Sequence, residues 1–338
     1  MTGVNLNMET NSNQNGREVL SIWQSCSALV VEVIAFIIVL IVSILLVINA
    51  FNIKPYDRGF FCDDQSLMFP YKEDTISSAQ AAAIALFVFP IVAIVVEILY
   101  ILSELHSEYT MKEIIYAVLR SLYSLVLFYI LGLAITQSVV SMMKLSAGRL
   151  RPNFFAWCNP EYNATGCDVG GGYITDFVCT NSNMDDVIDS KQSFPSGHSS
   201  SAVYAFTYVA IFLEIRLRYQ LKWRLYLRMI GPVIQTLLII AALYICLSRI
   251  QDNKHHPTDV LGGAVVGLVF CLITIFSWSR DEIFKPRPTA SKSLPVVQNS
   301  FRKHPSHISS SQNPIMQSTY SIANSSQEVT IEVPSSPL

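Results

Sequence analysis

Charged residues and cysteines are both scarce in this sequence. Only 14% of its 338 residues are Asp, Glu, Lys or Arg, against about 25% in an average soluble domain. The net charge of −2 gives no broad basic field, which excludes nucleic acid as a partner. Seven cysteines are too few for the scaffold of a small disulfide-rich secreted domain.

Apolar residues, in contrast, make up 51% of the chain and are gathered into six long runs. A helix needs about 20 mainly apolar residues to cross the hydrocarbon core of a bilayer. The runs are 28–51, 79–102, 121–143, 199–213, 229–247 and 260–279. The sequence therefore predicts an all-α integral membrane protein with six transmembrane helices. The fourth run is short, so we expect it to start earlier or to continue through Glu214 and Ile215.

The two ends of the chain differ in composition from this central part. The first residues are polar and rich in Asn, and the last residues are rich in Ser, Pro, Asn and Gln. Such segments bury too little apolar surface to offset the entropy of ordering. We expect a disordered N-terminus at 1–25, a six-span domain at 26–283 and a disordered Ser-rich tail at 284–338. The start of the chain lacks a basic-then-apolar leader, so we expect the first span to be an uncleaved anchor.

The distribution of Lys and Arg predicts the orientation in the membrane, because short cytosolic loops are enriched in positive charge. With six spans, 14 of the 23 Lys and Arg residues fall on the face that holds both termini. Five of them lie in the short connection 216–228. We therefore expect both termini to be cytosolic, and the opposite loops to be extracellular or lumenal.

Three short motifs at membrane ends lie on that opposite face. They span Lys144–Pro152, Phe194–Ser199 and Ser248–Asp259, and they hold five of the nine basic residues predicted to face outward. Because the rule for positive charge disfavours this placement, these residues need another reason to be there. We expect the three motifs to meet in one site.

The residue types in these motifs suit phosphoryl transfer. Arg binds phosphate oxygens bidentately, Lys adds a point charge, and backbone N–H groups at the start of a helix complete a cradle for the anion. His255 and Asp259 would share a helical face, at i and i+4, if the sixth span began there. The carboxylate would then fix the tautomer of His255 and leave its other nitrogen free to attack phosphorus. His198 would protonate the leaving alkoxide as a general acid.

The motifs resemble those of the lipid phosphate phosphatases, the type 2 phosphatidate phosphatases of the acid phosphatase and vanadium haloperoxidase superfamily. That family's pattern is Lys-x6-Arg-Pro, then Pro-Ser-Gly-His, then Ser-Arg-x5-His-x3-Asp. Every fixed position is present: Lys144, Arg151, Pro152, Pro195, Ser196, Gly197, His198, Ser248, Arg249, His255 and Asp259. Pro257 stands where many relatives carry Trp.

The resemblance implies a division of roles within the site. Five residues would hold the phosphate: Lys144, Arg151, Ser196, Gly197 and Arg249. His255 would be the nucleophile, Asp259 its partner and His198 the acid. Hydrolysis would proceed through a phosphohistidine, without a metal ion or another cofactor. Adjacent His255 and His256 could suggest zinc, but the sequence has no second cluster with ligand spacing.

We therefore predict a phosphohydrolase for lipid phosphate monoesters, with the active site on the extracellular or lumenal face. The substrates would be phosphatidate, lysophosphatidate, ceramide phosphate and sphingosine phosphate, and the location would be the plasma membrane. Two alternatives are a non-catalytic lipid-binding membrane scaffold and an anion transporter. A homo-oligomer is a further association that the sequence allows.

Two further features concern the outer loops. Cys62, Cys158, Cys167 and Cys179 fall on the predicted outer face, where oxidising conditions permit disulfides. Four thiols allow three complete pairings, which the sequence leaves open, and Cys158–Cys167 would enclose the shortest loop. Asn163 begins an Asn-Ala-Thr sequon and is a predicted glycosylation site.

Overall fold

The computed structural model describes residues 54–104, 111–162, 167, 172–219, 229–280 and 283, together with most of 30–44. The described residues of 30–44 are helical and belong to the first predicted span. The predicted disordered ends, 1–25 and 284–338, lie outside the described residues.

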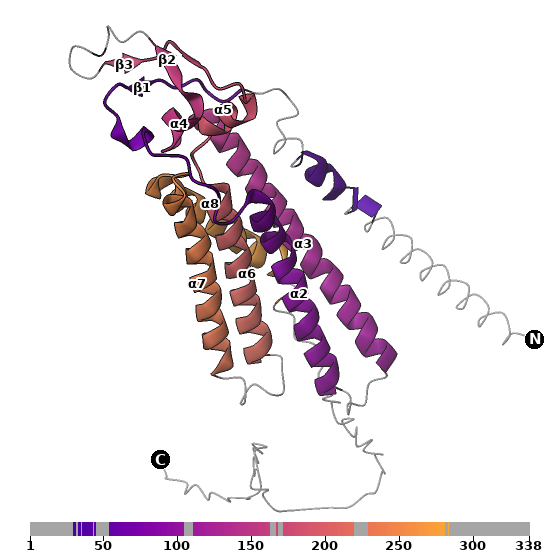
Figure 1. Cartoon of the computed structure of the whole chain (residues 1–338). Helices are drawn as coiled ribbons and strands as arrows, with labels where there is room; N and C mark the ends of the chain where they lie inside the picture. The colour runs from indigo at the N-terminus through magenta and orange to yellow at the C-terminus, as the bar shows by residue number, and fades with distance from the viewer. Residues whose placement is uncertain are drawn as a thin grey trace, which may run out of the picture. The chain divides into compact units, whose positions relative to one another are not determined.

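Five long helices run alongside one another in the described part of the chain (Figure 1). They are α2 (Ser78–Glu104), α3 (Met111–Ala147), α6 (Gly197–Tyr219), α7 (Ile230–Gln251) and α8 (Pro257–Ile273), which continues as a π-helical turn, η3 (Thr274–Trp278). Within the described residues, four segments are long and apolar enough to cross a membrane: Ser78–Leu102, Ile114–Ala147, Ile230–Gln251 and Pro257–Trp278. These match the second, third, fifth and sixth predicted spans.

Helix α6 is not among these four apolar segments, and its position in the bundle explains why it can be more polar. It packs against α2, α3, α7 and α8, so its neighbours are protein rather than lipid. Tyr204 and Tyr208 are fully buried, and their hydroxyls donate hydrogen bonds to the Tyr129 carbonyl at 2.9 Å and to Ser279 Oγ at 3.1 Å. A helix surrounded by protein can carry polar side chains that find partners. The helix begins before the predicted 199–213 and continues beyond it.

Small residues let α8 approach α6 closely. A Cβ at Gly263 would collide with the carbonyl oxygen of Ser196, and one at Gly267 with that of Ser200. Such contacts between backbones are typical of helices packed within membranes. The outer surfaces of the bundle are apolar instead, as on α7, where Val233, Leu237 and Ile240 are all more than half exposed.

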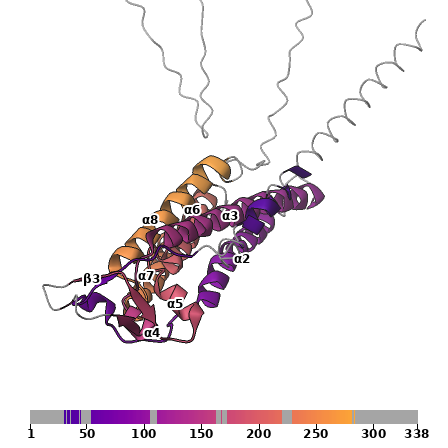
Figure 2. The ribbon, with the colours of Figure 1, turned by 90° about the horizontal axis from the view of Figure 1, so that it is seen from above.

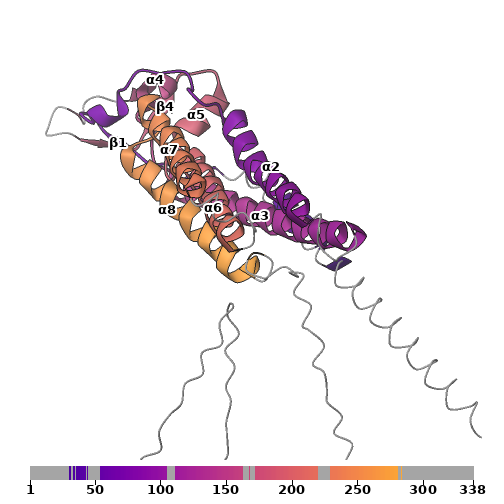
Figure 3. The ribbon, with the colours of Figure 1, turned by 90° about the horizontal axis from the view of Figure 1, so that it is seen from below.

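A cap of short elements covers one end of the helices (Figure 1), and the two turned views show α4 and α5 together in it (Figures 2 and 3). Helices α4 (Phe154–Cys158) and α5 (Met184–Ser190) lie here with a 3-10 turn, η1 (Gln65–Leu67). Two antiparallel pairs complete it: β1 (Phe60–Phe61) with β3 (Tyr173–Ile174), and β2 (Pro160–Tyr162) with β4 (Phe177–Cys179). These strands are the one departure from the expected all-α fold in the described part of the chain.

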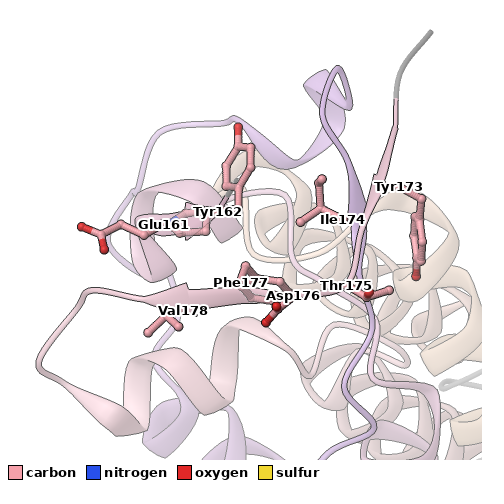
Figure 4. Close-up of a pocket in the computed structure, with 9 residues that line it drawn as sticks. Glu161, Tyr162, Tyr173, Ile174, Thr175, Asp176, Phe177 and Val178 are labelled. Carbon is pink, nitrogen blue, oxygen red and sulfur yellow. The ribbon is translucent and has the colours of Figure 1, made fainter. Parts of the chain in front are cut away.

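Disulfides and aromatic rings hold the cap together. The disulfides are Cys62–Cys167 and Cys158–Cys179, so the pairing with the shortest loop is not the one formed. The ring of Phe60 is 2% exposed and packs against Phe154, Phe155, Tyr162 and Phe177. A hollow of about 840 Å³ lies between β2, β3 and β4 (Figure 4). Its lining, 160–162 and 173–178, includes no residue of the three motifs.

Candidate active site

The three motifs meet at the end of the bundle that the cap covers (Figure 1). Lys144 lies in the last turn of α3, Gly197 opens α6, and the third motif joins α7 to α8. Backbone hydrogen bonds connect them: Ser193 N donates to the Arg149 carbonyl at 2.9 Å, and Ser196 N to the Asp259 carbonyl at 3.0 Å. Residues separated by more than 100 positions in the chain therefore form one site.

His255 is buried among positive charges. Its ring is 3% exposed, and Nδ1 lies 2.7 Å from the carbonyl oxygen of Ser193. Because a carbonyl only accepts, Nδ1 carries the proton and Nε2 keeps its lone pair. Burial, followed by the charges of Arg151 and Lys144, holds the pKa of His255 well below its usual value of 6.5. The ring is thus neutral, with one nitrogen available as a nucleophile.

No hydrogen bond joins the side chains of Asp259 and His255, which corrects the predicted pairing. Helix α8 begins at Pro257, so His255 precedes the helix and does not share a helical face with Asp259. The carboxylate instead accepts hydrogen bonds from the His256 backbone N–H at 3.0 Å and Ser193 Oγ at 2.6 Å. His256 is the N-cap residue of α8, and its Nδ1 lies 3.1 Å from Asp259 Oδ2. Asp259 therefore acts on His255 indirectly, through His256 and through Ser193, whose carbonyl orients the ring.

Arg149, which lies outside the family's fixed pattern, is the cationic partner of Asp259. Its guanidinium donates to Asp259 Oδ1 at 2.6 Å and to Thr258 Oγ1 at 2.7 Å. The Asp259 side chain is fully buried, so this partner offsets a charge that would be costly alone. These hydrogen bonds connect Arg149, in the first motif, to the first turn of α8.

Arg249 is held by two carboxylates. Its side chain is 1% exposed, and its guanidinium donates to Asp74 at 2.9 Å and to Asp252. Asp252 also accepts hydrogen bonds from the backbone N–H and the hydroxyl of Thr75, at 2.9 and 2.7 Å. Asp74 and Thr75 belong to the segment before α2, more than 170 residues away in the chain, and the sequence analysis missed them.

Arg151 is fixed in the same way by α5. Its guanidinium donates to the carbonyl of Asp189 at 2.8 Å and to its carboxylate at 2.5 Å. Arg151 is 6% exposed, whereas the Asp189 side chain is 44% exposed. The buried guanidinium is therefore held by a carboxylate that lies at the surface.

Lys254 is a further buried cation of the third motif, to which the sequence analysis assigned no role. Its Nζ lies 4.3 Å from the ring centres of both Tyr71 and Trp157, and 4.0 Å from Asp74. Contact with aromatic faces stabilises a cation away from water. The immediate neighbour of His255 is thereby held within the cap.

His198 is the second residue of α6. Its Nε2 lies 3.1 Å from the carbonyl oxygen of Ile76, so Nε2 donates and carries a proton. Arg249 and Lys144 are among the charges that act on this ring. The imidazole thus lies near the cations of the first and third motifs, and Nδ1 is the nitrogen that can gain and lose a further proton.

A cavity of about 770 Å³ lies between this polar end and the helices. Lys144, Gly197 and His198 line it together with further polar residues, Ser78, Gln137, Ser141, Asp185, Asp189, Gln192 and Ser201, and apolar side chains form much of the remaining wall. These include Leu40, Ile44, Ala81, Ala85, Leu86, Ile130, Leu133, Ala134 and Val140, from the 30–44 segment, α2 and α3. One cavity therefore has a polar end, with Lys144 and His198, and a largely apolar wall.

Gly197 borders the cavity, whereas its neighbour Ser196 is buried. A Cβ at Gly197 would meet its nearest atoms, Gln137 Oε1 and Val140, at 3.7 and 3.9 Å, which are ordinary contacts. Packing therefore does not require glycine there, and the open space faces the cavity. Ser196 is fully buried, and its Oγ accepts a hydrogen bond from Ser199 Oγ at 3.0 Å.

Comparison with known proteins agrees with this geometry. Residues 125–282 match the model of the PAP2 superfamily. The chain is 34% identical to phospholipid phosphatase 2 of Bos taurus over 251 residues, which are 74% of this chain and 82% of that protein. It is 35% identical to phospholipid phosphatase 1 of Rattus norvegicus over 72% of this chain and 83% of the relative. The chain belongs to the lipid phosphate phosphatase family. No solved structure matches it significantly.

A lipid phosphate phosphatase is a hydrolase in a membrane, and the four apolar helices fit that assignment. The comparison favours an enzyme over the scaffold and the transporter. Asn163 lies outside the described residues, so its glycosylation stays a prediction. Among the residues described, no group of three or more His, Cys, Asp or Glu could hold a metal ion.

Proposed function

We propose that this lipid phosphate phosphatase hydrolyses lipid phosphate monoesters through a phosphohistidine on His255. The observation that carries the proposal is the hydrogen bond from Nδ1 of His255 to the Ser193 carbonyl, 2.7 Å long and buried. It fixes the ring and leaves the Nε2 lone pair for attack. The residues that hold the phosphate would be Lys144, Arg151, Ser196, Gly197 and Arg249.

In the first step, Nε2 of His255 attacks phosphorus and the bond from phosphorus to the lipid oxygen breaks. His198 acts as an imidazolium, and one of its protons passes to that oxygen, so the ring becomes neutral and the lipid leaves as a neutral alcohol. Lys144, Arg151 and Arg249 stabilise the negative charge that develops on the three equatorial oxygens. Asp259 is a positioning residue in this scheme, because it acts through Ser193 and His256.

In the second step, water attacks the phosphohistidine, and the phosphorus–nitrogen bond breaks. His198, now neutral, accepts a proton from the attacking water, and inorganic phosphate leaves. The site then returns to its starting protonation. Three fixed cations provide the charge that metal ions provide in other phosphoryl-transfer sites, so we propose that no metal ion takes part.

The shape of the cavity supports lipids as substrates. A phosphate at Lys144 and His198 would leave the rest of the molecule beside the apolar wall formed by α2 and α3. Each CH₂ removed from water contributes about 0.8 kcal/mol, whichever backbone carries it. We therefore propose phosphatidate, lysophosphatidate, ceramide phosphate and sphingosine phosphate as substrates.

The proposed topology keeps six spans. Residues 28–51 and α6 would cross the membrane together with the four apolar helices. The cap and the site would face the extracellular or lumenal side of the plasma membrane, where disulfides are stable. The proposed domain lies at 26–283, between cytosolic tails at 1–25 and 284–338.

The test is to trap the enzyme during turnover. Purified chain in mixed micelles is mixed with ³²P-labelled lysophosphatidate and quenched in alkali, which preserves phosphohistidine. We expect a labelled protein in the wild type, loss of the label in acid, and no label in His255→Asn. A label in the His255→Asn variant would falsify the assignment of the nucleophile. Absence of phosphate release from any of the four lipids contradicts the function itself.

A further inference from the structure

A polar group interrupts the apolar wall of the cavity. Gln137 lies on α3, seven residues or about 10 Å before Lys144, and lines the cavity with Ser201 of α6. Ser201 lies four residues, or about 6 Å, from Gly197. The group therefore lies about one helical turn from Gly197 and two turns from Lys144, on the side away from the cap.

The hydrogen bonds within this group occupy its donors and leave one acceptor without a partner among the residues that the structure describes. The hydroxyls of Ser200 and Ser201 both donate to the Gly197 carbonyl at 2.9 Å. Their oxygens accept the two amide protons of Gln137, at 3.2 and 2.8 Å. Every side-chain donor of Gln137, Ser200 and Ser201 is thus hydrogen-bonded, and Oε1 of Gln137 is the acceptor that has no hydrogen bond from a described residue.

The free acceptor lies beside the cavity. No donor in the described part of the chain lies within hydrogen-bond distance of Oε1. The atom is directed toward the open space at Gly197, 3.7 Å from where a Cβ would stand. A polar atom in an apolar wall is costly unless it is hydrogen-bonded, so a ligand that supplies a donor gains affinity.

We infer that Gln137 selects lipid phosphates that carry a hydroxyl or N–H donor next to the phosphate, by accepting a hydrogen bond at Oε1. The inference rests on the proposed function. Lysophosphatidate has a hydroxyl four bonds from phosphorus, and sphingoid phosphates have one five bonds away. At about 1.2 Å per bond, an extended chain places these groups about 5–6 Å deeper than phosphorus, which matches the turn between Gly197 and Ser201. Phosphatidate has only ester acceptors there.

The experiment compares two substrates that differ in one hydroxyl. The chain hydrolyses 1-oleoyl lysophosphatidate and its 2-deoxy analogue in mixed micelles, and the ratio of the two kcat/KM values is measured. This ratio does not depend on how much enzyme is folded. We expect about 10 in the wild type, the effect of one neutral hydrogen bond, and a value near one in Gln137→Leu. If Gln137→Leu is inactive, the same ratio is measured on Gln137→Met, which also lacks the amide.

Gln235→Leu is the matched control. Gln235 also joins a helix to α6, through the Ala210 carbonyl at 3.3 Å and Glu214 at 2.9 Å, but it does not line the cavity. Its ratio should equal that of the wild type. A wild-type ratio near one, or a Gln137 variant that keeps the ratio of 10, overturns the inference and leaves the phosphatase function intact. Hydrolysis of neither lipid by the wild type overturns the proposed function instead.

Discussion

The site has a polar half under the cap and an apolar half in the cavity along α2 and α3, and the two halves are held together by different interactions. At the cap end, Arg249, Arg151 and Asp259 are buried, and each is matched by a partner of opposite charge. Along α2 and α3, side chains such as Ala85 and Leu133 make only dispersion and hydrophobic contacts. Charge pairs depend on the direction and distance of each partner, whereas apolar contacts tolerate changes of shape. The polar half should therefore decide whether the reaction occurs, and the apolar half which molecules reach it.

The largest effect should come from one of two adjacent histidines in the polar half. We expect His255→Ala to lower kcat at least about a thousandfold, because the nucleophile is lost. His256→Ala should cost far less, because His256 caps α8 and supports Asp259 without touching phosphate. The measurement is phosphate release from lysophosphatidate by both purified variants. Equal losses would show that the two neighbours do not differ in role.

The next effect tests the apolar half. We expect kcat/KM for phosphatidate to exceed that for glycerol phosphate by at least about a hundredfold, because a few buried CH₂ groups at about 0.8 kcal/mol each suffice. Phosphate release is compared at fixed surface concentration, with His255→Ala as the background. Similar efficiencies would mean that the cavity along α2 and α3 does not take the lipid chains.

Substitutions at two glycines should affect different properties, activity in one case and stability in the other. Gly197→Ala should lower kcat/KM about tenfold with little change in the melting temperature, because the added Cβ has room but faces the phosphate end. Gly263→Ala should instead destabilise the protein by about 1–3 kcal/mol, because its Cβ would collide with the Ser196 carbonyl. Thermal unfolding and activity are measured on both. The reverse pattern would contradict this division.

The pH profile tests the charges around the nucleophile. Because the pKa of His255 is lowered, the ring should stay unprotonated and active at pH below 6.5, and kcat/KM should fall only as pH drops through the lowered pKa. Removing one positive charge with Arg151→Gln should raise that pKa and move the acidic limb to higher pH. Using one substrate for both enzymes cancels the titration of its phosphate. An unchanged limb in Arg151→Gln would refute the coupling.

The smallest effect should come from removing metal ions. Since Lys144, Arg151 and Arg249 are fixed cations in the polar half, we expect activity to persist in excess EDTA. Phosphate release is measured before and after dialysis against the chelator. A loss that a divalent metal restores would show that the cations alone are insufficient.

Much of the polar half could be predicted because its residues lie in short segments of sequence. Lys144, Arg151, His198, Arg249 and His255 were expected in one site, and the structure brings their segments together. Their partners could not be predicted. Asp74 and Asp189 lie in segments with no recognisable motif, and only the folded cap brings them to Arg249 and Arg151.

The pairing of Asp259 shows why local spacing was insufficient. A spacing of four residues implies contact only when both residues lie in one helix. Pro257 fits the first helical position, so α8 starts there and leaves His255 outside it. The carbonyl that orients His255 then comes from Ser193, a residue that no side-chain motif could single out.

The sequence by itself determined the apolar helices, the chemistry of the three motifs and the family, because hydrophobic length and reactive side chains are local properties. Only the tertiary structure decided the central place of α6, the disulfide pairs and the carboxylates around each cation. These depend on which distant segments become neighbours, and many segments of similar composition could serve. The composition of a segment indicates the kind of environment that suits it, but the packing of the whole chain decides which residues become its neighbours.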